Sequence, residues 1–198
     1  LINCLMCGNR AGTGGDGSMV GGGCGGDGGD GGNIYVDASS NLRAIDCLIS
    51  GNQAGGGGQG SDGMWPSVGG DGGSGGGVWT SSADVRLIGC TVAHNYAGLP
   101  GHGGGGDGQP GHGAALYGNN AVPVVRNSIL WLAAPEAVGG QANITFSDVQ
   151  GGWSGTGNIS SNPLFVDPNG PDNDPNTWAD NNFRLAAGSP CIDAGSNV

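Results

Sequence analysis

The sequence contains no lysine, and five arginines are its only side chains with a permanent positive charge. It has 16 acidic residues and a net charge of −11, and Glu136 is its single glutamate. Nucleic acids and anionic membrane surfaces are bound through basic patches. This charge balance therefore argues against both as partners.

Long apolar runs are also absent. A membrane-spanning helix needs about 20 consecutive apolar residues, and no such run occurs. No secretory signal is recognisable, because the chain opens inside a strand-like segment, residues 1–4. We therefore expect no membrane span, and either a processed product or a fragment whose upstream repeats are missing.

Glycine is abundant instead, with 48 residues. Without collagen's strict period, so much glycine normally indicates disorder. Apolar positions nevertheless recur in register and five tryptophans are present, so we expect an ordered fold with glycine-rich inserts. The acidity, the lack of lysine and the six cysteines are typical of an extracellular protein.

One nine-residue phrase occurs three times, starting at Cys4, Cys47 and Cys90, each 43 residues after the last. A degenerate fourth copy covers residues 125–131. A fixed period of this size is typical of stacked repeats, each of which buries its apolar face on the next.

Apolar residues alternate within each phrase, which predicts a strand and hence an all-β parallel solenoid. Two buried columns follow, one of Ile2, Ile45, Ile88 and Val125, the other of Cys4, Cys47, Cys90 and Asn127. Asn9, Asn52 and Asn95 should stack where each strand turns, because asparagine tolerates left-handed backbone and hydrogen-bonds along a ladder.

Four C-terminal phrases accompany these repeats, at residues 127–131, 146–152, 162–167 and 183–195. The repeats resemble those of right-handed parallel β-helix proteins of bacterial surfaces. The ending is similar to the closing segment of planctomycete-type, choice-of-anchor-like secreted members. The resemblance implies a right-handed parallel β-helix at a bacterial cell surface or outside the cell. We assign residues 1–123 to three repeats with inserts and residues 124–198 to C-terminal coils and a closing segment.

The inserts have glycine at two of every three positions in residues 22–33 and 69–77. Polyproline II has three residues per turn, so this pattern leaves two bare faces that let backbones approach closely. We predict an out-and-back pair of polyproline II arms in each of the first three repeats. The outgoing arms would be residues 12–17, 55–63 and 98–106, and the return arms 21–33, 69–77 and 103–113. The alternative is three flexible glycine loops.

Apolar residues are expected at the tips between the arms, and they are Met19, Met64, Trp65 and Leu99. Exposed apolar tips form a candidate contact surface. The alternative is that they cap the ends of a bundle.

A column of carboxylates is expected on the return arms, made of Asp27, Asp71 and Asp107 if these arms align on Ile34, Val78 and Ala114. Like charges at strand spacing repel unless they are solvated or bridged by a cation.

The stronger calcium candidate is Asp167, Asn169, Asp172 and Asp174, since alternating Asp and Asn supply several oxygens from one loop. An acidic, proline-rich turn is the alternative. Calcium is the one cofactor that the sequence suggests.

Cys7 and Cys24 have no counterparts in the other repeats. We predict a disulfide between them that fastens the first arm to its strand. Cys191 has no obvious partner.

Catalysis has little support, because a lyase of this fold needs clustered carboxylates beside a basic residue and a glycosidase needs paired carboxylates. His94, His102 and His112 show no metal-ligand spacing. The leading hypothesis is a non-enzymatic extracellular structural or adhesive module. Its partners would be further copies stacked end to end into a filament, upstream repeats, or surface glycans. The alternatives are a carbohydrate-active β-helix enzyme, lyase-like or hydrolase-like, and an ice-binding surface.

Overall fold

The computed structural model describes residues 1–18 and 20–196, and in these residues it contains strands and no helix. The first sheet has five parallel strands in the order β1 (Leu5–Cys7), β4 (Leu48–Ser50), β7 (Thr91–Ala93), β10 (Ile129–Trp131) and β13 (Asp148–Val149). The second consists of β11 (Val138–Gly140), β8 (Leu116–Gly118), β5 (Val78–Thr80) and β2 (Ile34–Val36). The third consists of β12 (Asn143–Thr145), β9 (Val124–Arg126), β6 (Val85–Ile88) and β3 (Leu42–Ile45).

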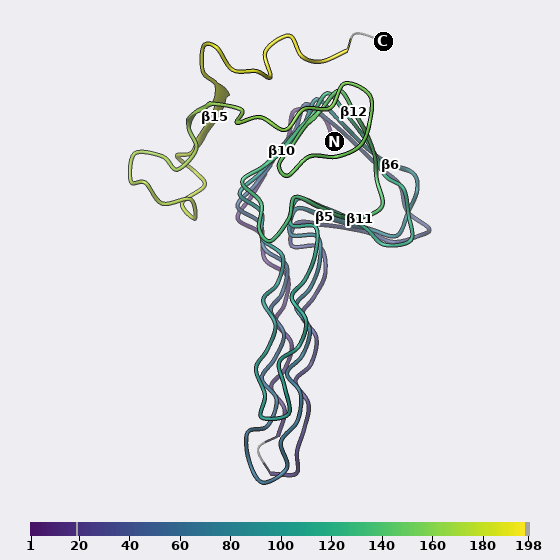
Figure 1. The fold of residues 1–198 in the computed structure, drawn as a ribbon, viewed down its shortest axis with the longest axis vertical. Helices are drawn as coiled ribbons and strands as arrows, with labels where there is room; N and C mark the ends of the chain where they lie inside the picture. The colour runs from purple at the N-terminus through teal and green to yellow at the C-terminus, as the bar shows by residue number, and fades with distance from the viewer. Residues whose placement is uncertain (19, 197–198) are drawn as a thin grey trace.

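Strands of successive repeats pair in parallel at the spacing of the sequence repeat. Leu48 lies opposite Leu5 on one side and opposite Thr91 on the other. Each coil of the chain passes through the third, first and second sheets in turn, and the coils stack as a triangular ring (Figure 1). The predicted all-β class and parallel stacking are confirmed, and the three sheets are consistent with a β-solenoid.

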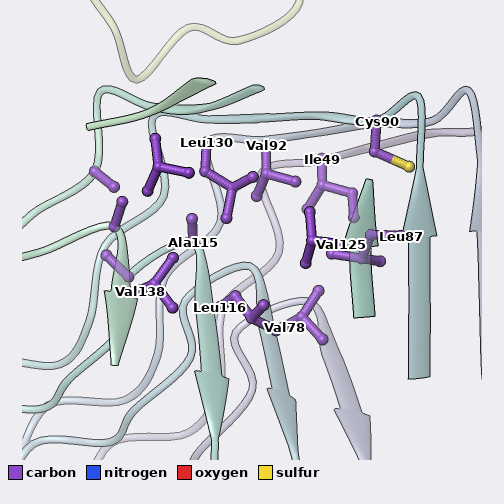
Figure 2. Close-up of a cluster of buried hydrophobic side chains, with 14 of the residues drawn as sticks. Ile49, Val78, Leu87, Cys90, Val92, Ala115, Leu116, Val125, Leu130 and Val138 are labelled. Carbon is purple, nitrogen blue, oxygen red and sulfur yellow. The ribbon is translucent and has the colours of Figure 1, made fainter. Parts of the chain in front are cut away.

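The core lies inside this triangle, where each sheet contributes one inward row. Ile49 and Val92 come from the first sheet, Leu116 from the second, and Leu87 and Val125 from the third (Figure 2). All five side chains are fully buried. Burial of each such side chain contributes roughly 1.5–3 kcal/mol, so the stacked rows hold the coils in register.

Ile2, Ile45 and Ile88 stack as predicted, since Ile2 pairs with Ile45 and Ile45 with Ile88. The column is not buried, because Ile45 and Ile88 are only half-buried and Ile2 is 65% exposed. Strand alternation is interrupted at Asp46, whose φ of 50° turns the chain between the third and first sheets. The inward residues on either side of this turn are therefore Ala44 and Cys47.

The fourth repeat is also shifted by one residue from the predicted register. Val125 lies opposite Leu87 instead of Ile88. The backbone N–H of Cys90 donates to the Ser128 hydroxyl (3.1 Å), so Ser128 takes the place predicted for Asn127. Asn127 instead forms the corner, with a φ of 50°.

The asparagine ladder is confirmed. The backbone N–H of Asn9 donates to the Asn52 side-chain oxygen (2.9 Å), and that of Asn52 donates to Asn95 (3.0 Å). Asn52 and Asn95 are fully buried, and the side-chain amide of each donates to a carbonyl of the preceding coil, Met6 and Ile49 respectively.

The C-terminal segment contains the antiparallel pair β14 (Phe165–Asp167) and β15 (Asn182–Leu185). Phe183 packs edge-on against Phe165 and lies 5.7 Å from the His94 ring, which attaches the pair to the coil of β7. Trp153 packs against the core beyond the last coil and donates its indole N–H to the Ala142 carbonyl (3.2 Å).

Candidate functional site

The glycine-rich segments leave the stacked coils between the first and second sheets. We call residues 12–17, 55–61 and 98–103 the outgoing arms and residues 23–33, 68–77 and 106–115 the return arms. Together they form a long, narrow stalk of stacked chains that projects from one corner of the triangle (Figure 1). The third pair is shorter and turns at residues 103–106, where the Gly106 N–H donates to the Gly103 carbonyl (2.9 Å).

Backbone hydrogen bonds connect the arms at every third residue. Along the outgoing arms, the N–H of Gly14 donates to Gly56 (2.8 Å) and that of Gly17 to Gln59 (2.7 Å). Between outgoing and return arms, Gly58 donates to Gly26 (2.8 Å). The same three-residue step is repeated by Gly25 to Val68, Gly28 to Asp71, Gly55 to Gly29, Gly70 to Gly58, Gly73 to Gly55, Gly98 to Gly73 and Gly101 to Gly70.

These bonds bring backbones so close that most arm glycines leave no room for a side chain. A Cβ built on Gly70 would collide with the carbonyl of Gly26, and one on Gly57 would collide with the carbonyl of Gly70. Gly26 itself lies on the outer side, where a Cβ would be 3.2 Å from the Gly15 nitrogen. Gly26 is therefore less crowded than Gly70.

The third residue of each step carries a side chain whose oxygen accepts the next coil's backbone N–H. Asp27 accepts from Asp71 (2.9 Å), and Asp71 accepts from Gln109 (2.7 Å). The column therefore ends in Gln109 instead of the predicted Asp107, because Val78 aligns with Leu116 and not with Ala114. Two further ladders follow the same rule, Asp30–Ser74–His112 and Asp16–Gln59–His102.

Sequence reasoning placed Asp27 and Asp71 in one column, but it treated the third positions as facing solvent or a cation and missed these bonds to backbone N–H groups. Their signal is present in the sequence, since oxygen-bearing residues recur at these positions. Partial burial raises the pKa of Asp30, the Ser74 N–H opposes this effect, and the neighbouring charge of Asp27 adds to it. The carboxylates of Asp27 and Asp30 thus repel each other, although each accepts a hydrogen bond from a backbone N–H of the next coil.

The turn of the second arm pair exposes a large apolar surface. Met64 is 88% exposed and Trp65 67%, and Val20 in the first turn is 91% exposed. The Trp65 Cβ lies next to Gly22, so the first two turns are in contact. Met19 lies outside the described residues.

Leu99 does not belong to a turn. It lies in the third outgoing arm, where its carbonyl accepts from the Gly57 N–H (2.9 Å), and its side chain is 70% exposed on the flank of the stalk. The predicted tip position of Leu99 is therefore wrong, because the third pair turns at residues 103–106.

All six cysteines lie among the described residues, and none of them forms a disulfide. The predicted Cys7–Cys24 bond is therefore wrong. The Cys7 sulfur lies 3.2 Å from the Ser50 hydroxyl in the first sheet, whereas Cys24 is exposed near the outer end of its return arm.

The residues predicted to bind calcium use their side chains within their own loop. Asp172 accepts from the Asp174 N–H (3.0 Å) and from the Thr177 hydroxyl (2.8 Å), and both bonds lower its pKa. Asp174 accepts from Asn176, and Asn169 donates to Asn173 (3.2 Å). The described residues contain no group of three or more acidic, His or Cys side chains that could hold a metal ion. Calcium binding at Asp167–Asp174 stays a prediction.

A cavity of about 270 Å³ lies between the solenoid and the C-terminal segment. Asp148 and Cys191 line it, and the Cys191 thiol donates to the Asp148 carboxylate (3.0 Å). Burial raises the pKa of Asp148, and burial together with this carboxylate raises the pKa of Cys191 to about 12. A thiol with such a pKa is protonated at neutral pH, and it is the thiolate that acts as a nucleophile. The pair therefore serves to attach the C-terminal segment.

Sequence reasoning also missed an aromatic stack on the second sheet. The rings of Tyr35 and Trp79 lie 4.3 Å apart and nearly parallel, and Tyr117 continues the same row. Aromatic residues at equivalent places of successive repeats were the signal.

No family model, curated protein or solved structure matches this chain. The described residues form no helix with the length and hydrophobicity that a membrane crossing needs.

Proposed function

We propose that the protein is a non-enzymatic, extracellular structural or adhesive module of a bacterial cell surface. Its body is a right-handed parallel β-helix, and its arms are polyproline II helices. The three-residue step of hydrogen bonds and of side-chain positions supports the polyproline II assignment. The stalk holds an adhesive apolar turn away from the body.

The observation that carries this proposal is the exposure of Met64 and Trp65 at the far end of a densely hydrogen-bonded stalk. Ordering a residue costs roughly 1–2 kcal/mol, and more for glycine. A stalk this long and rich in glycine therefore needs its regular backbone hydrogen bonds to stay ordered. The feature that it exposes at its end is the apolar turn. Exposed aromatic and apolar surface at such a place is typical of contact sites, and surface glycans are the ligands we propose.

The test compares Met64→Ser/Trp65→Ser with Leu99→Ser, a control whose side chain is about as exposed as that of Trp65 but lies on the flank. We expect the unchanged chain and the control to bind to members of a panel of immobilised polysaccharides. The double variant should not bind to them. Equal retention of all three would contradict the role of the turn. Release of new reducing ends from the same polysaccharides would instead favour the carbohydrate-active alternative.

A further inference from the structure

We propose that the outer face of the first arm pair is a docking surface for a further glycine-rich coil of the same repeat type. We call this surface, formed by residues 12–17 and 23–31, the repeat-1 face. The incoming coil would lie parallel to repeat 1, on the side where β1, β2 and β3 have no neighbouring strand. This inference does not depend on what the apolar turns bind.

The first argument is that repeat 1 contains glycines that nothing in this chain requires. A Cβ on Gly12 or Gly15 would meet no atom within 4 Å, and neither residue has a positive φ. Their counterparts Gly55 and Gly58 are needed, because a Cβ there would collide with the carbonyls of Gly12 and Gly15. Repeat 1 therefore has the composition of an internal layer.

The second argument is the set of backbone donors that repeat 1 leaves without a partner among the described residues. They are the N–H groups of Gly12, Gly15, Asp16, Asp27 and Asp30. The equivalent groups in repeat 2 all bind repeat 1. Gly55 donates to Gly29, and Gly58 donates to Gly26. Gln59, Asp71 and Ser74 donate to the carboxylates of Asp16, Asp27 and Asp30.

The third argument is that the opposite face of the stalk is closed by proline. Pro100 follows Leu99 at the place where repeat 2 has Gly57, whose N–H donates to Leu99 (2.9 Å). Pro110 likewise replaces Gly72, whose N–H donates to Gln109 (2.8 Å). Proline has no backbone N–H, so repeat 3 cannot donate outward at these positions, whereas repeat 1 is left open.

This asymmetry argues against a second copy of the chain as the end-to-end occupant. The repeat-3 face of a copy lacks the outward donors at Pro100 and Pro110, and its fourth coil has no arms between β10 and β11. It therefore argues against the end-to-end filament that the sequence suggested.

The occupant's chemistry follows from how repeats 1 and 2 fit together. It must donate a backbone N–H at every third residue to the carbonyls of repeat 1, just as repeat 1 donates backbone N–H groups to the carbonyls of repeat 2. It must have glycine where Gly12 and Gly15 approach it. At the remaining positions it needs side-chain oxygens for the free N–H groups of Asp16, Asp27 and Asp30. A Gly-Gly-X arm with Asp, Asn, Ser or Gln at X meets all three requirements.

The test adds one coil to the existing chain. Residues 44–86 are fused directly before Leu1, which keeps the 43-residue period because Ile2 pairs with Ile45. In the added coil, Gln59, Asp71 and Ser74 face the N–H groups of Asp16, Asp27 and Asp30. We expect hydrogen exchange at the five free amides to slow by about tenfold or more, while exchange at Gly98 and Gly101 is unchanged.

The matched control carries Asp71→Ala in the added coil only. It should restore fast exchange at Asp27 and leave Asp30 protected, which a general stabilisation would not do. A second fusion with residues 1–43 guards against misfolding of the first added coil.

Fast exchange at all five amides in both fusions would overturn the proposal. Protection of the same amides in the unfused chain, appearing only as it dimerises, would also overturn it, since the occupant would then be a second copy.

Discussion

The arm glycines share one backbone pattern, but they differ in what lies beside them. Gly70 lies between neighbouring arms, and a side chain there would strike the Gly26 carbonyl. Gly15 faces open space at ordinary φ. The two residues therefore form a natural pair for separating packed arms from free loops.

We expect Gly70→Ala to lower the free energy of unfolding by about 1–3 kcal/mol, because the added methyl forces packed backbones apart. Gly15→Ala should cause no loss, and a gain of up to about 1 kcal/mol is expected from the smaller entropy of the unfolded chain. Urea denaturation measures both values. A neutral result for Gly70→Ala would show that the arms are independent flexible loops.

Asp148 is a residue whose ionisation opposes folding. It is buried, and burial raises its pKa above the ordinary value of 3.8, against the opposing bonds from Cys191 and Ser161. The folded state then holds the proton more tightly than the unfolded state. The stabilising contribution is therefore complete below about pH 4 and is lost as the pH rises through the raised pKa.

The stability of Asp148→Asn relative to the unchanged chain should therefore increase from pH 4 to pH 7. Asparagine keeps an oxygen for the Ser161 N–H but carries no charge. Urea midpoints at the two pH values measure the difference. Asp172→Asn is the control, because Asp172 is exposed and its pKa is lowered. A difference that does not change with pH would show that the buried carboxyl titrates normally.

At the scale of the strand, truncating an inward side chain should cost much more folding free energy than truncating an outward one. Ile49 on β4 is fully buried, whereas Ile45 on β3 is only half-buried beside the turn at Asp46. Ile49→Ala should cost about 2–5 kcal/mol, and Ile45→Ala clearly less. Equal losses in urea denaturation would restore the prediction that the column of Ile2, Ile45 and Ile88 is buried.

The strands were predictable because the 43-residue period fixes which residues are neighbours. The corners were not, since alternation does not reveal where a left-handed residue such as Asp46 or Asn127 interrupts it. The third return arm was misaligned by two residues, because its predicted spacing from the second arm was too short. Its spacing from the second arm is 38 residues, as the bond from the Gln109 N–H to Asp71 shows, and a glycine-rich sequence offers few side chains by which to fix the register.

The exposed turn at Met64 and Trp65 could be named from the sequence because apolar residues between glycine tracts are conspicuous. The ladders of Asp27 and Asp30 could not, because they depend on a side-chain oxygen reaching a backbone N–H of another coil. Such bonds follow only from the stacking geometry, which composition does not contain.

At the scale of the whole molecule, the net charge of −11 is concentrated by stacking. The ladders place Asp27 beside Asp71, and the one arginine–carboxylate pair among the described residues, Arg86 with Asp84, is exposed and long at 3.8 Å. Repulsion between exposed carboxylates is screened over about 10 Å at 0.1 M salt. The folded stack should therefore gain more from added salt than the expanded unfolded chain does.

We expect the melting temperature to rise between 10 mM and 500 mM NaCl, as differential scanning calorimetry can measure. CaCl₂ at equal ionic strength separates general screening from a specific site. If the loop of Asp167, Asn169, Asp172 and Asp174 binds calcium, CaCl₂ should raise the melting temperature further, and chelator should remove that increment. Asp172→Ala/Asp174→Ala should abolish the calcium increment and keep the NaCl effect, because these side chains lie outside the arm ladders. Equal effects of the two salts would indicate that this loop is an acidic turn without a calcium site. A melting temperature that does not change with NaCl would mean that the hydrogen-bond partners of the stacked carboxylates in the ladders already offset their repulsion.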